Sequence, residues 1–285
     1  MAEKNVFISK TEYPFFEEVH VNIDWFGGFA MSQKRKNQIG LHQNFLMAYP
    51  DEKVLEISSS SLLSLGSRLS AMNLSKRTQK GLTIVESAFQ SSRIYGDGVR
   101  TVGPFPEYLF LPGRECKKLV KEASKGMHSD RYEFDGLTFY APAHHVSQFY
   151  DFLYLNALLE PENKAVREKL LQEGYTAFTD LVTKSLNCQA RSAAIFVSLV
   201  RAGLIDEVRD YASYMKLFRT QANGKAAGPQ AYECVQILYM DKVKLLSPVV
   251  PCRFYKEDVE AYYVEHCSML DNRKEEDNYL DLRCG

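Results

Sequence analysis

The segment Glu86-Ser87-Ala88-Phe89-Gln90-Ser91-Ser92-Arg93 lies within a predicted helix over about Ile84–Ile94. Residues three, four and seven apart share one face of a helix, so Glu86, Gln90 and Arg93 are expected to lie together, with Phe89 beside them. An acid, an amide, a cation and an aromatic ring on one face are suited to chemistry on a sugar. Taken alone, the spacing fits an ordinary solvated Glu–Arg pair better.

The sequence around this helix predicts an α+β fold. We expect a helix-dominated single catalytic domain with a small antiparallel sheet. Apolar alternation and turn residues predict strands at Glu17–Asp24, Lys53–Ser58, Glu107–Leu111 and Gly136–Tyr140. Apolar periodicity predicts helices from Ser32 to about Met47 and at Glu115–Ser124, His145–Leu159, Ala165–Gln172, Gln189–Arg201, Asp206–Phe218 and Lys256–Met269.

Composition describes an ordinary globular chain. Its 285 residues include 35 Lys and Arg against 36 Asp and Glu, and 45% are hydrophobic, which excludes a mainly disordered chain. No apolar run is long enough to span a membrane, and the first residues lack a signal-peptide pattern, so we expect a cytoplasmic protein. The six Cys are scattered, which argues against a zinc site or a disulfide framework, and we expect neither metal nor cofactor.

The near-neutral charge is an average of two regions. Residues 256–285 contain 4 basic and 9 acidic residues, a net charge of −5, so the other 255 residues carry +4. A mildly basic body is compatible with a phosphate-bearing ligand. The acidic tail either docks a basic partner or only keeps the chain soluble, and both interpretations stay open.

Two further segments fit the binding of an anion or a nucleotide. If Ser32 is an N-cap, then Lys34, Arg35 and Lys36 lie in the first helical turn, where free backbone N–H groups favour phosphate. The alternative is a solvated loop. Trp25 lies just upstream and either stacks on a base or belongs to the core. Polar residues at the start of a later helix, Gln189 and Arg191, fit anion binding or simple capping.

These segments occur in an order that resembles the NADAR (YbiA-like) family. The resemblance spans about Lys53–Leu204 and rests on Val54–Ser58, Gly66 to Ser70 and Asn73, the Glu86-x-x-Phe89-Gln90-x-x-Arg93 helix, Phe149-Tyr150-Asp151, Thr179-Asp180 and the helix from Gln189. The block from Trp25 to Lys36 resembles the branch encoded beside DarT-type DNA ADP-ribosyltransferase toxins. Arg93 and Tyr150 stand where the family usually has Lys and Trp, and the stretch before the last helix is shorter.

The resemblance implies an N-glycosidase that removes ADP-ribose from guanine bases of DNA and so acts as an antitoxin. The implied binding partners are ADP-ribosylated DNA or ADP-ribose, and the toxin itself is a further candidate partner. No membrane association is implied. Glu86, Lys34 and Asp180 become the candidate catalytic residues, Lys34 (or Lys36) as a Schiff-base amine. The candidate ligand-binding residues are Trp25, Ser32, Arg35, Lys36, Ser70, Asn73, Phe89, Gln90, Arg93, Tyr150, Gln189 and Arg191.

The same resemblance divides the chain into three parts. Residues 1–52 are expected to form an N-terminal extension that contributes to the site, residues 53–205 the catalytic core, and residues 206–285 a helical extension with the acidic tail.

Three other interpretations of the chain remain open. They are a NADAR-type glycosidase for a small phosphoribosylated metabolite such as a riboflavin precursor, a binding protein that neutralises a toxin without catalysis, and a globular α+β protein with an accidental motif.

Overall fold

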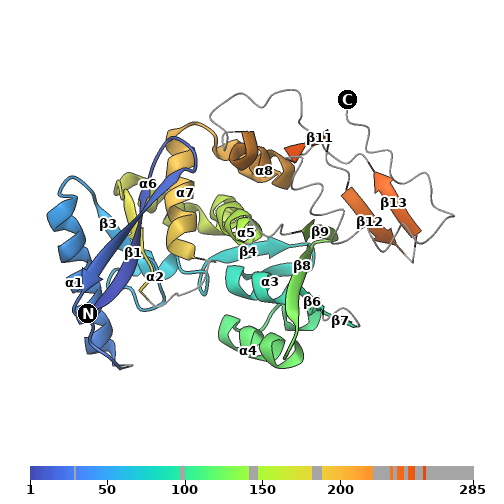
Figure 1. The fold of residues 1–285 in the computed structure, drawn as a ribbon, viewed down its shortest axis with the longest axis horizontal. Coiled ribbons are helices and arrows are strands. Elements are labelled where there is room, and N and C mark those ends of the chain that lie inside the picture. Colours follow the sequence, from blue (N-terminus) through green and yellow to red (C-terminus); the bar gives the residue numbers. More distant parts are fainter. Residues whose placement is uncertain are drawn as a thin grey trace. The chain divides into compact units, whose positions relative to one another are not determined.

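The computed structural model describes residues 1–28, 30–96, 100–140, 147–181 and 188–220, and the short strands at 232–233, 236–240, 243–247 and 253–254 (Figure 1). The chain forms two compact units, Met1–Asp206 and Glu207–Gly285. The architecture is mixed α+β, with several small sheets. The predicted helix at Lys256–Met269 and the acidic tail, residues 256–285, lie outside the described residues.

The first unit contains a four-stranded sheet in the order β2-β1-β10-β3. β1 (Ala2–Ser9) is antiparallel to both β2 (Phe16–Ile23) and β10 (Ala177–Thr179), and β10 is parallel to β3 (Val54–Glu56). The sequence predicts an antiparallel sheet, and this prediction is wrong for the pair β10 and β3, which run parallel. The sheet also joins the N-terminal residues to strands from the middle and the end of the unit.

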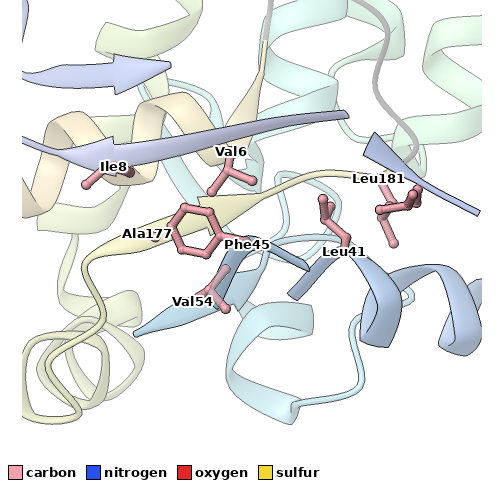
Figure 2. Packing of buried hydrophobic residues seen from close by; sticks show 8 residues of the cluster. Val6, Ile8, Leu41, Phe45, Val54, Ala177 and Leu181 are labelled. Carbon is pink, nitrogen blue, oxygen red and sulfur yellow. The ribbon is translucent and has the colours of Figure 1, made fainter. Parts of the chain in front are cut away.

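Helix α1 (Met31–Ala48) covers one face of this sheet and forms an apolar core with it. Leu41 and Phe45 are fully buried, and Figure 2 shows them beside Val6, Val54 and Ala177 from three of the strands. Burying large side chains such as these stabilises the fold by roughly 1.5–3 kcal/mol each. The core fixes α1 against this sheet.

A second four-stranded sheet has the order β7-β6-β8-β9, and all of its pairs are antiparallel. Its strands are β6 (Arg93–Gly96), β7 (Thr101–Val102), β8 (His128–Phe134) and β9 (Leu137–Tyr140). The hairpin β4 (Ser75–Thr78) and β5 (Gly81–Ile84) leads directly into α3 (Val85–Ser91). The sequence predicted only β9 among these strands. The others mix polar with apolar residues, and all of them except β8 are at most four residues long.

The remaining helices enclose the middle of the first unit. α5 (Gln148–Leu159) packs against α3, α6 and α7, and it is buried along almost its whole length. α7 (Gln189–Arg201) also packs against β1 and β10. The other helices of this unit are α2 (Ser64–Arg68), α4 (Gly113–Ala123) and α6 (Lys164–Gln172), with 3-10 turns at Pro106–Tyr108 and Pro161–Asn163.

Three local predictions were wrong. The expected strand Glu107–Leu111 contains a 3-10 turn at Pro106–Tyr108, because Pro106 fixes its own φ and supplies no N–H to a strand ladder. The helix after Ile84 ends at Ser91, which places Arg93 in β6. α1 begins at Met31 with Ala30 as the N-cap residue, so Ser32 lies inside the helix.

The second unit begins within the 3-10 turn Ile205–Arg209 and contains α8 (Tyr211–Thr220). Its short strands form two pairs. β11 (Tyr232–Glu233) pairs with β14 (Arg253–Phe254), and β12 (Gln236–Met240) pairs with β13 (Val243–Ser247). The single helix predicted at Asp206–Phe218 is thus a 3-10 turn followed by a separate α-helix.

Candidate active site

Glu86 and Gln90 lie on one face of α3, as their spacing predicts. Both side chains are buried, and Gln90 Nε2 donates a hydrogen bond of 3.1 Å to Glu86 Oε1. The Glu86 backbone N–H donates to the Ala71 carbonyl at 3.0 Å, which anchors the start of α3 to the turn at residues 70–73. Lys117 Nζ from α4 lies 3.7 Å from the same carboxylate oxygen, while most of the Lys117 side chain is exposed. The carboxylate therefore lies at the edge of solvent with a cation beside it.

A glycine allows α4 to approach this carboxylate. A Cβ added at Gly113 would lie 2.8 Å from Met72 Sδ and 2.9 Å from Glu86 Cγ. Such distances are too short for carbon in a protein, so any side chain at Gly113 displaces Glu86 or Met72. The first turn of α4 thus fixes the orientation of the Glu86 side chain.

Arg93 approaches the same region from β6 rather than from the helix. Its guanidinium carbon lies 4.8 Å from the Tyr95 ring centre and 5.6 Å from the Phe89 ring centre. Arg93 Nε is buried, and it has no hydrogen-bond partner in the described part of the chain. A buried guanidinium N–H without a partner is costly, which makes this group a candidate for an oxygen of a ligand.

Aromatic rings surround this group. Phe89 is packed edge-on against Tyr150 at 5.0 Å between ring centres, and Tyr132 and Phe149 lie within the same cluster. Burial raises the pKa of Tyr150 well above its usual value, and the negative charges of Glu86 and Asp180 raise it further. The Tyr150 hydroxyl is thus neutral and lies within the field of both candidate catalytic carboxylates. The structure brings Glu86, Phe89, Gln90, Arg93 and Tyr150 together.

Asp180 follows β10 and is held by Gln189. The Gln189 amide nitrogen donates to Asp180 Oδ2 at 2.9 Å and to the Ile57 carbonyl at 2.7 Å, and its oxygen accepts from the Ala71 N–H at 2.8 Å. Both N–H groups and the oxygen of this amide are thereby used within the protein. We call Gln189 with these three partners the Gln189 brace. It positions Asp180 and joins it to the turn that also anchors Glu86.

Arg191 is bound by the core of the first unit. It forms an ion pair of 2.9 Å with the buried Asp151 of α5, and Ser192 Oγ donates to the same carboxylate at 2.6 Å. Burial raises the pKa of Asp151, while Arg191 and Ser192 oppose the shift. The pair joins α5 to α7, and it has the features of a structural contact.

The turn at residues 70–73 holds two further predicted residues. Ser70 is buried, and its Oγ accepts from the Met72 N–H at 3.3 Å. Asn73 is exposed, and its amide donates to the Ser67 carbonyl at 2.8 Å. Asn73 is the more accessible of the two to a ligand.

The predicted N-terminal residues lie in the segment between β2 and α1 and at the start of α1. Trp25 is 43% exposed, and Lys4 Nζ lies 4.4 Å above its ring. Because α1 begins at Met31, Lys34, Arg35 and Lys36 occupy its fourth to sixth positions rather than its first turn. Ser32, Arg35 and Lys36 are exposed. Among the described residues, no hydrogen bond or ion pair joins Lys34 to Glu86.

One buried carboxylate escaped prediction. Glu56, at the end of β3, accepts from Thr179 Oγ1 at 2.6 Å and from the Leu181 N–H at 3.1 Å, on either side of Asp180. Burial, and then the charge of Asp180, raises the Glu56 pKa to about 7. His42 Nε2 lies 3.0 Å from the same Thr179 hydroxyl, and burial lowers the His42 pKa to about 4. An acidic residue inside the apolar run Val54–Ile57 was the available signal.

The described residues contain no group of three or more His, Cys, Asp and Glu side chains that could hold a metal ion. In the same part of the chain, no helix has the length and apolar character needed to cross a membrane. The candidate site is therefore built from carboxylates, amides, cations and rings.

Comparison with known proteins decides the family. Residues 2–228 match the family described as DarT1-associated NADAR antitoxin. The chain belongs to this family. Membership covers the N-terminal strands and α1 as well as the segment that carries the Glu86 motif. No curated protein matches the chain. The DarT1-associated NADAR assignment confirms the family and the toxin association that the sequence motifs indicated.

Proposed function

We propose that this NADAR protein is an ADP-ribosyl glycohydrolase that removes ADP-ribose from guanine bases of DNA and so reverses the damage done by a DarT1-type toxin. Membership of an antitoxin family supports the biological role. The buried Glu86 carboxylate, held by Gln90 at the edge of solvent, is the observation that carries the chemistry.

Glu86 is the proposed catalytic carboxylate. When the bond between guanine and ribose breaks, positive charge develops on the sugar, and a nearby carboxylate stabilises that charge or activates the attacking water. Gln90 keeps one carboxylate oxygen in place through its 3.1 Å hydrogen bond. Gln90 and Arg93 then orient ribose hydroxyls or a phosphate, and Phe89 and Tyr150 supply the apolar wall. The Gln189 brace positions Asp180 as a second carboxylate.

Cationic side chains are proposed to bind the diphosphate of ADP-ribose. Arg93 has a buried N–H without a protein partner in the described residues, and Lys117 lies beside Glu86 with most of its side chain in solvent. Charge-assisted hydrogen bonds from such groups are suited to phosphate oxygens. Lys34, Arg35 and Lys36 remain proposed ligand contacts, with Lys34 as the candidate Schiff-base amine toward an opened ribose.

The proposal is tested by release of ADP-ribose from an oligonucleotide that carries ADP-ribosylated guanine. We expect wild-type protein to release it and Glu86→Gln to be slower by about a hundredfold or more. Glu160→Gln is the matched control, because Glu160 is also a largely buried carboxylate in an ion pair, with Lys76 at 2.6 Å. Equal turnover by Glu86→Gln and wild type would refute the role of Glu86. Full protection from the toxin by an inactive Glu86→Gln would instead indicate neutralisation by binding.

The Schiff-base step has its own test. Borohydride reduces an imine to a stable amine, so a productive Lys34 adduct is expected to be trapped during turnover and located by peptide mass spectrometry. Lys164→Ala, which removes an exposed lysine from α6, should not alter trapping. Turnover without any trapped adduct at Lys34 or Lys36 would exclude this step and leave the carboxylate mechanism in place.

A further inference from the structure

The segment between β2 and α1 presents two neighbouring aromatic rings to solvent. Trp25 and Phe26 are 43% and 44% exposed, which is unusual for such large apolar side chains. Lys4 Nζ lies 4.4 Å from the centre of the Trp25 ring, and Lys36 Nζ lies 5.2 Å from that of Phe26. We call these four side chains the Trp25–Phe26 platform.

The backbone of the platform is fixed before any ligand arrives. Asn37, which is almost fully buried, accepts from the Phe26 N–H at 2.9 Å and donates to the Phe26 carbonyl at 2.9 Å. Gly28 has a φ of +114°, and a Cβ there would lie 2.4 Å from Gln33 Oε1. The turn into α1 is thus specified by its own residues. A preformed surface loses little conformational entropy when it binds.

The segment that carries the platform has a net positive charge. Residues 24–36 contain Lys34, Arg35 and Lys36 but only one acidic residue, Asp24, and the first turn of α1 has no acidic residue. Within the described residues, no carboxylate forms an ion pair with these three cations. Lys4 Nζ lies over the Trp25 ring and also donates to the Leu181 carbonyl at 3.0 Å, so Lys34, Arg35 and Lys36 are the cations left to meet phosphates next to the stacking surface.

We infer that the Trp25–Phe26 platform binds a single-stranded stretch of the substrate DNA, with unpaired bases on the rings and phosphates on Lys34, Arg35 and Lys36. Every base has a flat face, so stacking is independent of sequence but requires bases that are not paired in a duplex. This inference rests on the proposed DNA substrate and adds a contact to an unpaired stretch of it. Since the cations are few and the whole chain is near neutral, the affinity is expected to be modest.

Trp25 is the only tryptophan of the chain, so its fluorescence reports on the platform alone. We expect an unmodified 12-residue oligothymidylate to quench it saturably. If about three phosphates are neutralised, binding should weaken roughly 15-fold between 50 and 200 mM salt. A strand of the same length without bases, and a duplex, should quench far less. Lys36→Ala should weaken binding several-fold, while Lys164→Ala, which removes a cation from α6, should not.

The outcomes separate this inference from the proposed function, because unmodified DNA requires no turnover. Quenching without release of ADP-ribose from modified DNA supports the platform and refutes the glycohydrolase. Turnover without quenching refutes the platform alone. The inference is also overturned if the strand without bases binds equally well, if both lysine variants behave alike, or if only the purified toxin quenches Trp25, since the surface is then a protein interface.

Discussion

The Gln189 brace and the Glu86 face of α3 lie close to each other, but they differ in how completely their polar groups are paired. Every donor and acceptor of the Gln189 amide has a partner within the protein. On α3, Glu86 receives one amide hydrogen bond and faces a lysine at 3.7 Å, and the nearby Arg93 Nε has no partner among the described residues.

We use this difference to distinguish polar groups that stabilise the fold from polar groups that are candidates for binding a ligand. A fully satisfied buried group stabilises the fold and gains little from a ligand, whereas an incompletely satisfied group gains a partner when a ligand binds. Gln189 and Arg191 were both predicted to bind ligand, and both are engaged with protein groups. Variants of the Gln189 brace should therefore lower stability, together with any turnover that depends on Asp180, whereas variants of the Glu86 face should lower turnover without loss of stability.

The largest effect is expected for Gln189→Ala. It removes the partners of the Ala71 N–H, the Ile57 carbonyl and Asp180, and unsatisfied buried groups cost about 1–3 kcal/mol each. We expect the free energy of unfolding to fall by roughly 3–5 kcal/mol in urea denaturation. Gln79→Ala is the control, because Gln79 is exposed and its amide donates a single bond, to the Asp135 carbonyl. A similar loss in free energy of unfolding in both variants would contradict the stabilising role of the Gln189 brace.

Glu56 should make stability fall as pH rises. Its folded pKa of about 7 lies above the ordinary 4.5, so its contribution is complete below pH 4.5 and is lost as pH rises through 7. The shift corresponds to roughly 3 kcal/mol. Unfolding measured from pH 4.5 to 8 should show this loss in wild type and not in Glu56→Gln. His42, whose pKa is lowered to about 4, acts in the opposite direction between pH 6.5 and 4, so His42→Gln separates the two contributions.

Gly113→Ala tests whether the α3 face depends on close packing. The added Cβ would lie within 3.0 Å of Glu86 Cβ and Cγ, so the carboxylate must move. A displacement of about 1 Å at a catalytic group costs on the order of a hundredfold in rate. We expect that loss in ADP-ribose release from a protein that still folds. Gly40→Ala in α1, where an added Cβ meets nothing within 4 Å, should keep full activity and gain up to about 1 kcal/mol of stability.

The same two regions show how far the sequence could predict the site. The Glu86–Gln90 contact is a local i,i+4 pair, so helical periodicity was sufficient to find it. The partners of Gln189 are 118, 132 and 9 residues away, and only tertiary structure brings them together. β1 escaped prediction because its first half, Glu3-Lys4-Asn5, is polar and its pairing with β10 is distant in sequence. Ser32 was a good N-cap by residue type, yet Ala30 is the N-cap residue, so α1 begins two residues earlier than a cap at Ser32 would place it.

Arg93→Lys should give the smallest effect, and it tests most directly whether Arg93 is a ligand-binding or a structural group. Lysine keeps the positive charge but loses the planar guanidinium that lies against Phe89 and Tyr95 and carries Nε, for which the described residues offer no hydrogen-bond partner. If that guanidinium binds the substrate, KM should rise about tenfold, a loss of roughly 1.4 kcal/mol, while kcat and stability change little. Arg77→Lys, at an exposed arginine bonded to Glu162, should leave KM unchanged. A loss of stability in Arg93→Lys without a change in KM would mean that Arg93 belongs with the Gln189 brace as a structural group, and that burial without a partner does not mark the ligand side of this fold.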